Sequence, residues 1–300
     1  MNSTQQLQQK FGIKNIVSIT EKAPAYPVLN VSNQYATASI ALHGAHVMEF
    51  QPGGQEPVLW LSRDAVYGEG KPIRGGIPIC WPWFGGHLDR KLPAHGFVRN
   101  RFWQLESTDQ LEDGSTRVIM TTGDDAISRS MWDYHFRLRL TVVVGNALSL
   151  ALEMENLGAS SFTITGALHS YFSVADVSKV DVLGLEGVEY IDSLLGKKHL
   201  TQTDPIHFGG ELDRMYYPTR SNEILRDYQQ NRDILLKKTG SRSTVVWNPW
   251  DAKADSMADF ERGGYRNMVC VETANAAGDI VQLAPNETHM LGVTITVELS

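Results

Sequence analysis

The chain has 300 residues, of which 42% are hydrophobic and 20% are charged, a composition typical of a globular protein. Its formal net charge of −7 argues against nucleic acid or an anionic membrane surface as the main partner. Its two cysteines are too few for a disulfide framework, which favours a reducing compartment.

The N-terminal segment is polar and lacks the apolar core of a signal peptide. No stretch approaches the roughly 20 apolar residues that a membrane-spanning helix needs. We therefore expect a cytoplasmic protein without a membrane partner. Nothing in the sequence requires more than a monomer.

Helical patterns are scarce in this sequence. Residues 1–10 predict a short polar helix, and residues 122–132 predict a second one that begins near Asp124 or Asp125. Residues 223–238 are compatible with either a helix or a pair of strands.

Alternation of apolar and polar residues, which is typical of strands, dominates the rest of the chain. It predicts a strand over 35–51 that ends at a Pro-Gly-Gly turn, and a hairpin over 136–156 with a tight turn at Gly145-Asn146. Further strand patterns lie at 162–174, 243–250, 267–276 and 289–299. The sequence thus predicts an all-β fold, a large antiparallel β-sandwich with few short helices.

Residues 71–103 are the least regular part of the sequence. This segment contains Arg74, His95, Arg99 and Arg101 together with Trp81, Trp83, Phe84 and Phe97. Its glycines and prolines hold a loop in one shape, and guanidinium groups bind oxyanions at two points. The tryptophan faces suit the apolar faces of sugar rings. The alternative is a loop packed by its own aromatic side chains, with its arginines in surface ion pairs.

Two ionisable residues interrupt otherwise apolar strand patterns. His169 shares a predicted strand face with Tyr171, and Glu272 shares one with Cys270. Burying a carboxylate costs several kcal/mol unless it is paired or hydrogen-bonded. From the residues alone, each is compatible with a structural role, as a satisfied core histidine or a buried salt bridge, as well as with a role in a site.

Other chemistries lack support in the sequence. His43 and His46 are three residues apart, so on one strand they face opposite ways and cannot share a metal ion. There is no Gly-x-Ser-x-Gly motif of a hydrolase, and neither Cys80 nor Cys270 lies where a thiolate would be activated. We expect no metal and no cofactor.

Five segments, in this order and spacing, resemble the hexose-6-phosphate mutarotases, the glucose-6-phosphate 1-epimerases of the galactose-mutarotase-like superfamily. They are IRGGIPICWPWFG, LPAHGFVRN, ALHSYF, LDRMYY and VCVETA. The resemblance covers about residues 25–298, and it implies the same antiparallel sandwich. We accordingly expect residues 1–24 to be an N-terminal extension or edge segment, and residues 25–300 to be a single domain.

The resemblance also implies roles for individual residues. His169 matches the general acid that protonates the ring oxygen, and Glu272 matches the base that takes the proton of the anomeric hydroxyl. Asp213 matches a carboxylate that binds substrate hydroxyls. Arg74, His95 and Arg99 match positions that line the sugar site, with the two arginines on the 6-phosphate. Ala94 departs from relatives that carry Gln before the loop histidine, so one side-chain contact to the sugar is lost.

The implied reaction is the interconversion of the α and β anomers of a hexose 6-phosphate, which needs no redox step, metal or covalent intermediate. One group donates a proton while another accepts one. We expect His169 to start charged and Glu272 ionised, because a carboxylate near an imidazole raises the pKa of the imidazole and lowers its own.

Two alternatives stay open. The first keeps the chemistry but acts on unphosphorylated aldoses, and it gains if Arg74 and Arg99 are both held in structural ion pairs. The second is a non-catalytic carbohydrate-binding regulator, which needs neither His169 nor Glu272.

Overall fold

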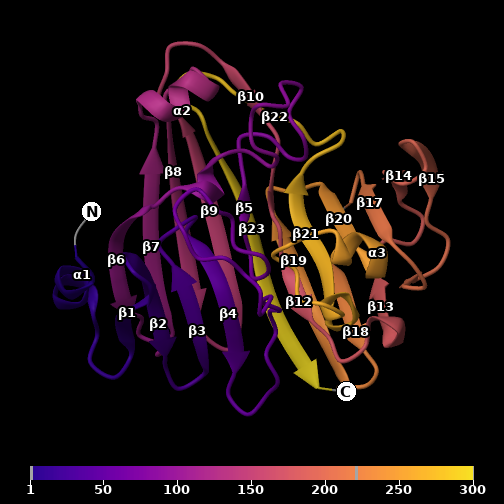
Figure 1. Ribbon diagram of the computed structural model, residues 1–300, viewed down its shortest axis with the longest axis horizontal. Helices are drawn as coiled ribbons and strands as arrows, with labels where there is room; N and C mark the ends of the chain where they lie inside the picture. Colours follow the sequence, from indigo (N-terminus) through magenta and orange to yellow (C-terminus); the bar gives the residue numbers. More distant parts are fainter. Residues whose placement is uncertain (1–2, 220–221, 300) are drawn as a thin grey trace.

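A computed structural model describes residues 3–219 and 222–299, and its sheets are antiparallel throughout (Figure 1). The predicted β-sandwich with few short helices is therefore confirmed. The described α-helices are α1 (Thr4–Phe11), α2 (Ala126–Met131) and α3 (Trp250–Asp255). Short 3₁₀ helices are η1 (Val98–Asn100), η2 (Val177–Lys179) and η3 (Gly264–Asn267).

One layer of the sandwich is a nine-stranded sheet with the strand order β16-β13-β18-β19-β23-β9-β8-β7-β6. In that order, its strands are Ile206–His207, Val180–Leu183, Glu223–Asp227, Arg232–Thr239, Thr288–Leu299, Leu148–Asn156, Phe136–Val144, Thr116–Gly123 and Gln104–Gln110. The hairpin predicted over 136–156 is confirmed as β8 and β9. Alternate residues of both strands are buried along their whole length.

Two further sheets cover this layer (Figure 1). The four-stranded sheet has the order β1-β2-β3-β4, with strands Val17–Ala23, Tyr26–Ser32, Ala36–Ala41 and His46–Pro52. The eight-stranded sheet has the order β15-β14-β17-β20-β21-β11-β5, and β12 also pairs with β21. Its strands are Lys198–Thr201, Glu189–Asp192, Leu212–Tyr216, Ser243–Asn248, Met268–Asn275, Gly166–Leu168, Ile79–Cys80 and Tyr171–Ser173. A separate pair consists of β10 (Phe162–Ile164) and β22 (Val281–Leu283).

The main hydrophobic core lies between the layers. Alternation along β8 places Leu138 and Leu140 in it, and alternation along β21 adds Val269 and Val271 from the facing sheet. Because side chains alternate along a strand, Cys270 and Glu272 point to the opposite face of the eight-stranded sheet. The packing of the core therefore directs Glu272 away from it.

Several sequence predictions are resolved by the structure. The helices predicted near the N-terminus and over 122–132 are confirmed, and Asp125 is the N-cap of the second one, where its side chain accepts from the amide of Ser128. Residues 223–238, left open between helix and strands, are the hairpin of β18 and β19.

Two predicted strands are each divided. The single strand predicted over 35–51 was wrong: β3 and β4 are separated by a turn in which Gly44 and Ala45 adopt positive φ angles. The strand predicted over 162–174 is likewise interrupted after Leu168. There the amide of His169 donates to the carbonyl of Pro78, which lies outside β21.

The N-terminal segment packs on the rest of the fold. β1 pairs with β2 at the edge of the four-stranded sheet, and Leu7 and Phe11 of α1 join the main core. The division into residues 1–24 and 25–300 stays a prediction. Across the described ranges, no helix has the length and apolar character needed to cross a membrane.

Candidate functional site

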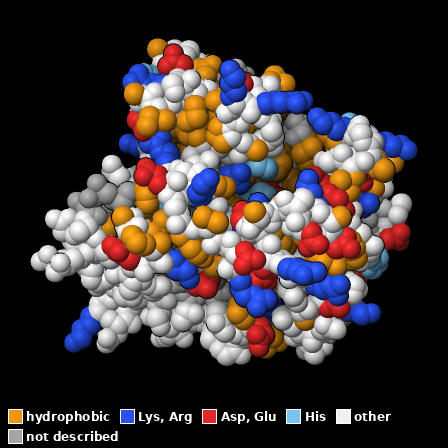
Figure 2. All heavy atoms as spheres, viewed as in Figure 1, with side chains coloured by type: hydrophobic (Ala, Val, Ile, Leu, Met, Phe, Trp, Pro, Cys, Tyr) orange, Lys and Arg blue, Asp and Glu red, His pale blue; other side chains and the backbone are white. Residues whose placement is uncertain are grey.

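A cleft of about 590 Å³ opens on the face of the eight-stranded sheet that points away from the main core. Its volume is ordinary for a small-molecule site, and other surface hollows of this protein are as large. Its lining is what distinguishes it. The structure brings together in this cleft all six residues singled out from the sequence, which are Arg74, His95, Arg99, His169, Asp213 and Glu272. Figure 2 shows histidine side chains within a hollow bordered by lysine and arginine.

Three adjacent strands form the base of the cleft. Asp213 of β17 pairs with Trp247 of β20, and Trp247 pairs in turn with Cys270 of β21. In this register the side chains of Asp213, Trp247 and Glu272 all reach the cleft. Because directly paired residues point to the same face of a sheet, the site is set by strand pairing.

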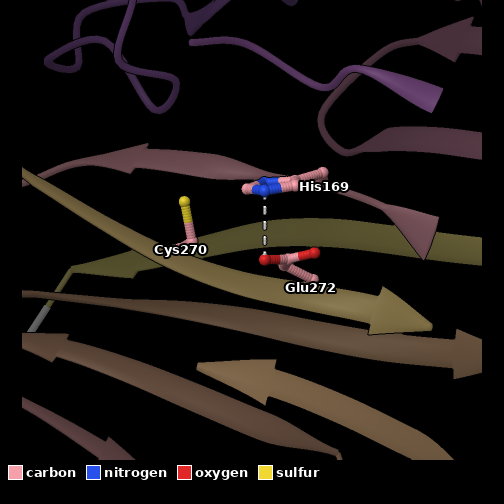
Figure 3. Close-up of side chains that lie close together, drawn as sticks. All are labelled: His169, Cys270 and Glu272. Atoms are coloured by element: carbon pink, nitrogen blue, oxygen red, sulfur yellow. Dashed lines mark ion pairs between the residues drawn. The ribbon is translucent and has the colours of Figure 1, made fainter. Parts of the chain in front are cut away.

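His169 and Glu272 meet at the base of the cleft. Nε2 of His169 lies 3.3 Å from Oε1 of Glu272, and the two residues are only 8% and 1% exposed. Figure 3 shows the imidazole edge-on, with the carboxylate of Glu272 rising toward it from β21. The two groups are therefore close enough to share one proton, and both face the cleft.

Burial controls the protonation of this pair. It raises the pKa of the Glu272 carboxyl well above its usual range, and neighbouring Asp213 raises it further. It lowers the pKa of the His169 imidazole well below its usual range, and His95 and Arg99 add to the effect. Both shifts oppose the expected charged His169 and ionised Glu272, because desolvation acts against their mutual attraction. Burial therefore favours the neutral forms of both side chains.

Aromatic rings fix the orientation of His169. The ring of Tyr171 is stacked on the imidazole, with centroids 4.8 Å apart and planes 9° apart. Trp247 meets the imidazole at 82°, with centroids 6.2 Å apart, and His95 lies 5.7 Å away on another side. A ring held on several sides keeps one rotamer, which a proton-transferring group requires.

The two arginines of the cleft differ in their partners. Arg74 donates to Asp259 at 3.2 Å and to the hydroxyl of Tyr171 at 3.0 Å, so its charge is compensated. Arg99 donates to the carbonyl of Ala94 at 2.9 Å. Within the described part of the chain, Arg99 has no carboxylate partner within 4.0 Å, and its buried Nε has no hydrogen-bond partner. Arg99 is therefore a cation available to an anionic group.

His95 is a neutral hydrogen-bonding group. Burial and the neighbouring charge of Arg99 lower its pKa to about 3. Its Nδ1 accepts from the amide of Gly85 at 3.3 Å, so the ring proton lies on Nε2. His95 can therefore donate to a hydroxyl in the cleft without adding charge.

Asp213 is held on one side. The hydroxyl of Ser193 donates to it at 3.0 Å. Burial raises its pKa above the usual range, and the carboxylate of Asp192 adds to this. With one oxygen held by Ser193, its other oxygen can accept from a hydroxyl in the cleft.

Cys270 lies beside the His169–Glu272 pair without lining the cleft. Burial raises the pKa of its thiol well above the usual range, and burial raises the pKa of Cys80 to about 12. Both thiols are thus protonated, in agreement with the prediction that neither cysteine is activated.

The sequence missed several cleft residues and misplaced others. Trp81 is fully buried in the main core, and Trp83 packs against His87 and donates to the carbonyl of Pro93, so neither offers a face to the cleft. Trp247 takes that position instead. The strand pattern over 243–250 could have identified Trp247 from the sequence. No sequence pattern indicated Lys197, which lies at the tip of the β14–β15 hairpin and also lines the cleft.

Comparisons with known proteins agree with this fold. Residues 27–296 match the aldose 1-epimerase family. A relative from Escherichia coli (strain K12), named "Putative glucose-6-phosphate 1-epimerase", is 38% identical over 82% of both chains. A relative of the same name from Salmonella typhimurium is 37% identical over 89% of both chains. The crystal structure of "a putative mutarotase (YeaD)" from Salmonella typhimurium superposes with a TM-score of 0.89, at 34% identity, covering 95% of this chain and 94% of that one.

The chain therefore belongs to the aldose 1-epimerase family. It is an enzyme that acts on a sugar and interconverts its α and β anomers.

The stacking of Tyr171 on His169 gives a test of the geometry. We expect Tyr171→Leu, which removes the stacked ring, to lower kcat about tenfold to a hundredfold, because small misplacements of a reacting group cost this much. Tyr171→Phe keeps the ring and loses only the hydroxyl, so we expect a loss of about tenfold at most. Anomer-exchange rates measured by NMR check both variants. Equal kcat values for the leucine variant and the natural protein would contradict this role.

Proposed function

We propose that this enzyme is a hexose-6-phosphate 1-epimerase in which His169 and Glu272 transfer the protons. The names of the relatives support a phosphorylated substrate. The observation that carries the proposal is the contact of His169 and Glu272 at the base of a cleft that also contains an uncompensated cation, Arg99.

The proposed reaction begins with the proton that the pair shares. Moving it from Glu272 to His169 changes no net charge and creates an imidazolium beside a carboxylate. Glu272 then takes the proton of the C1 hydroxyl while His169 protonates the ring oxygen, and the bond between C1 and the ring oxygen breaks. Each positioned proton transfer contributes about 10²–10⁴-fold.

Ring opening leaves an aldehyde, a neutral imidazole and a protonated carboxyl. This is the pair that burial favours in the free protein, so the buried environment stabilises the protonation state of the open-chain stage. Rotation about the C1–C2 bond then presents the other face of the aldehyde. Ring closure reverses both proton transfers and leaves the imidazolium beside the carboxylate, and return of the proton from His169 to Glu272 restores the neutral pair.

The remaining residues bind the sugar and its phosphate. We assign Asp213 and His95 to hydroxyl groups of the sugar. The free oxygen of Asp213 can accept a hydrogen bond, and the neutral ring of His95 can donate one. We assign Arg99 to the phosphate, with Lys197 as a second cation at the rim of the cleft. Arg74 also lines the cleft, but Asp259 compensates its charge, so it contributes less to binding an anion than Arg99 does.

The substrate class is tested by anomer-exchange NMR on glucose 6-phosphate beside glucose and galactose. We expect acceleration of the phosphorylated sugar with the higher kcat/KM, because Arg99 and Lys197 stabilise its charge. The ion pair of Arg74 with Asp259 is the one observation that favours the alternative, an epimerase of unphosphorylated aldoses. Acceleration of glucose and galactose alone would establish that alternative.

Arg99→Met tests the phosphate assignment. Charge-assisted hydrogen bonds contribute about 1.5–3 kcal/mol, so we expect KM for glucose 6-phosphate to rise about 10- to 150-fold. Arg101→Met is the matched control, because Arg101 lies in the same segment but pairs with Asp125 and does not line the cleft. An unchanged KM in Arg99→Met would exclude Arg99 as the phosphate ligand.

Removal of either proton-transferring group tests the mechanism. We expect His169→Asn and Glu272→Gln each to lower kcat by about 10²–10⁴-fold, the value of one positioned proton transfer. Both replacements are nearly isosteric and uncharged, so circular dichroism and the thermal midpoint should show an intact fold. If either folded variant retained near-normal turnover, its proposed role would be wrong.

The pH dependence of kcat follows from the shared proton. Below the pKa of His169 both groups carry a proton, and above the pKa of Glu272 neither does, so activity falls on both sides. Burial lowers the first pKa and raises the second, and we therefore expect a bell-shaped profile that is wider than for an exposed pair. The other titratable or charged groups near the pair are Arg74, His95, Arg99, Tyr171, Asp213 and Cys270.

The profile is measured at saturating substrate, because the phosphate of free substrate itself titrates near about pH 6. The residual activity of Glu272→Gln should lack the alkaline limb. An alkaline limb that persists unchanged in this variant would assign it to another group.

A further inference from the structure

Cys270 adds a third donor atom to the His169–Glu272 pair. Cys270 lies two residues before Glu272 on β21, so both side chains extend from the same face of that strand. A ring nitrogen of His169, Sγ of Cys270 and a carboxylate oxygen of Glu272 all lie within 4.8 Å of one another. Figure 3 shows the thiol and the carboxylate rising from β21 toward the imidazole.

These donors are buried and incompletely satisfied. The exposed fractions of His169, Cys270 and Glu272 are 8%, 0% and 1%. Nδ1 of His169 and Oε2 of Glu272 are inaccessible to solvent and have no hydrogen-bond partner among the described residues. A buried polar atom without a partner costs about 1–3 kcal/mol. A ligand bound by both carboxylate oxygens of Glu272 would satisfy Oε2 and remove that cost at the carboxylate.

The donor set selects the kind of ligand. Imidazole nitrogen, thiolate sulfur and carboxylate oxygen together suit Zn²⁺ and similar divalent transition metals, whereas Mg²⁺ and Ca²⁺ prefer oxygen alone. Zn²⁺ bonds of about 2.0–2.3 Å in a tetrahedral site place the ligand atoms about 3.3–3.6 Å apart. Nε2 of His169 and Oε1 of Glu272 are already 3.3 Å apart. Side-chain rotations that shorten the longest separation by about 1 Å would complete the triangle.

We propose that His169, Cys270 and Glu272 form an inhibitory site for Zn²⁺ or a chemically similar divalent transition metal. The metal enters through the cleft, which His169 and Glu272 both line. Binding displaces the thiol proton of Cys270 and the proton that the pair shares. Zn²⁺ thereby removes the acid and the base at once, and only this consequence for catalysis rests on the proposed function.

Titration of the metal-free protein with Co²⁺ tests the site without measuring activity. We expect the near-ultraviolet charge-transfer absorption of a cobalt–thiolate bond, displaced by Zn²⁺ and unaffected by Mg²⁺. Cys80→Ala is the matched control, since it removes the other buried thiol of the chain and should keep the band. Cys270→Ala should abolish the band. Absence of the band from the natural protein, or its persistence in Cys270→Ala, would overturn the proposal.

Two further variants keep the test decisive. Cys270→Ser preserves the volume of the side chain, so it replaces Cys270→Ala if circular dichroism shows that the alanine variant does not fold. Glu272→Gln keeps the thiol but removes a charged ligand. We expect it to weaken Co²⁺ binding at least about tenfold. Loss of a residue that only hydrogen-bonds to a metal ligand already costs about that much, and Glu272 is proposed to bind the metal directly. Equal Co²⁺ affinity in Glu272→Gln would remove Glu272 from the site and overturn the three-ligand proposal.

Inhibition of anomer exchange supplies the second readout. We expect Zn²⁺ to slow exchange and EDTA to restore it. Cys270→Ala should be active without metal and should need at least about tenfold more Zn²⁺ for the same inhibition. Equal Zn²⁺ sensitivity in both proteins would overturn the inhibitory role. A cobalt–thiolate band in a protein that accelerates no sugar would refute the proposed function while leaving the metal site supported.

Discussion

The burial of two ionisable side chains against each other is the constraint on which the site depends. Taking one such group out of water costs several kcal/mol, and a partner can repay this cost only when its position is fixed. Here Glu272 is fixed by a strand paired on both sides, and His169 by the junction between two strands that pair with the same neighbour. The rigid sheet therefore makes it possible to keep the carboxyl of Glu272 and the imidazole of His169 buried 3.3 Å apart.

The charged side chains of the cleft differ in how far their charges are compensated. Burial lowers the pKa of His95, which favours its neutral form, and Arg74 is paired with Asp259. Arg99, in contrast, lacks a carboxylate partner within the described ranges, and Lys197 is exposed at the rim. Under the proposed function, these cations give a sugar with an anionic substituent a preferred orientation in the cleft.

The β-sandwich was predictable from the sequence because alternation is a local signal, and the hairpin of β8 and β9 carries it without interruption. The divisions at Gly44 and at His169 were not, since a turn or a break within an alternating stretch depends on partners distant in sequence. Motif resemblance selected the six cleft residues. It could not indicate that Asp259 compensates Arg74, because these residues are separated by most of the chain.

The protonation of the pair was also beyond the sequence. Proximity alone favours a charged histidine beside an ionised glutamate, and only the structure shows how completely water is excluded from His169 and Glu272. Burial is a property of the whole fold, so a residue pattern cannot supply it.

The interruption between β11 and β12 has a consequence for how this fold can diversify. Leu168 pairs with Thr273 and Tyr171 with Cys270, so the strand register continues unchanged across the break. The spacing of His169 and Glu272 is therefore set by sheet pairing, whereas Arg99 and Lys197 are carried by connecting segments. Under the proposed function, insertions in those segments would alter which sugar is accepted without moving His169 and Glu272. A single inserted residue at the break would instead shift one half of the strand against β21 and separate the chemistry from its substrate site.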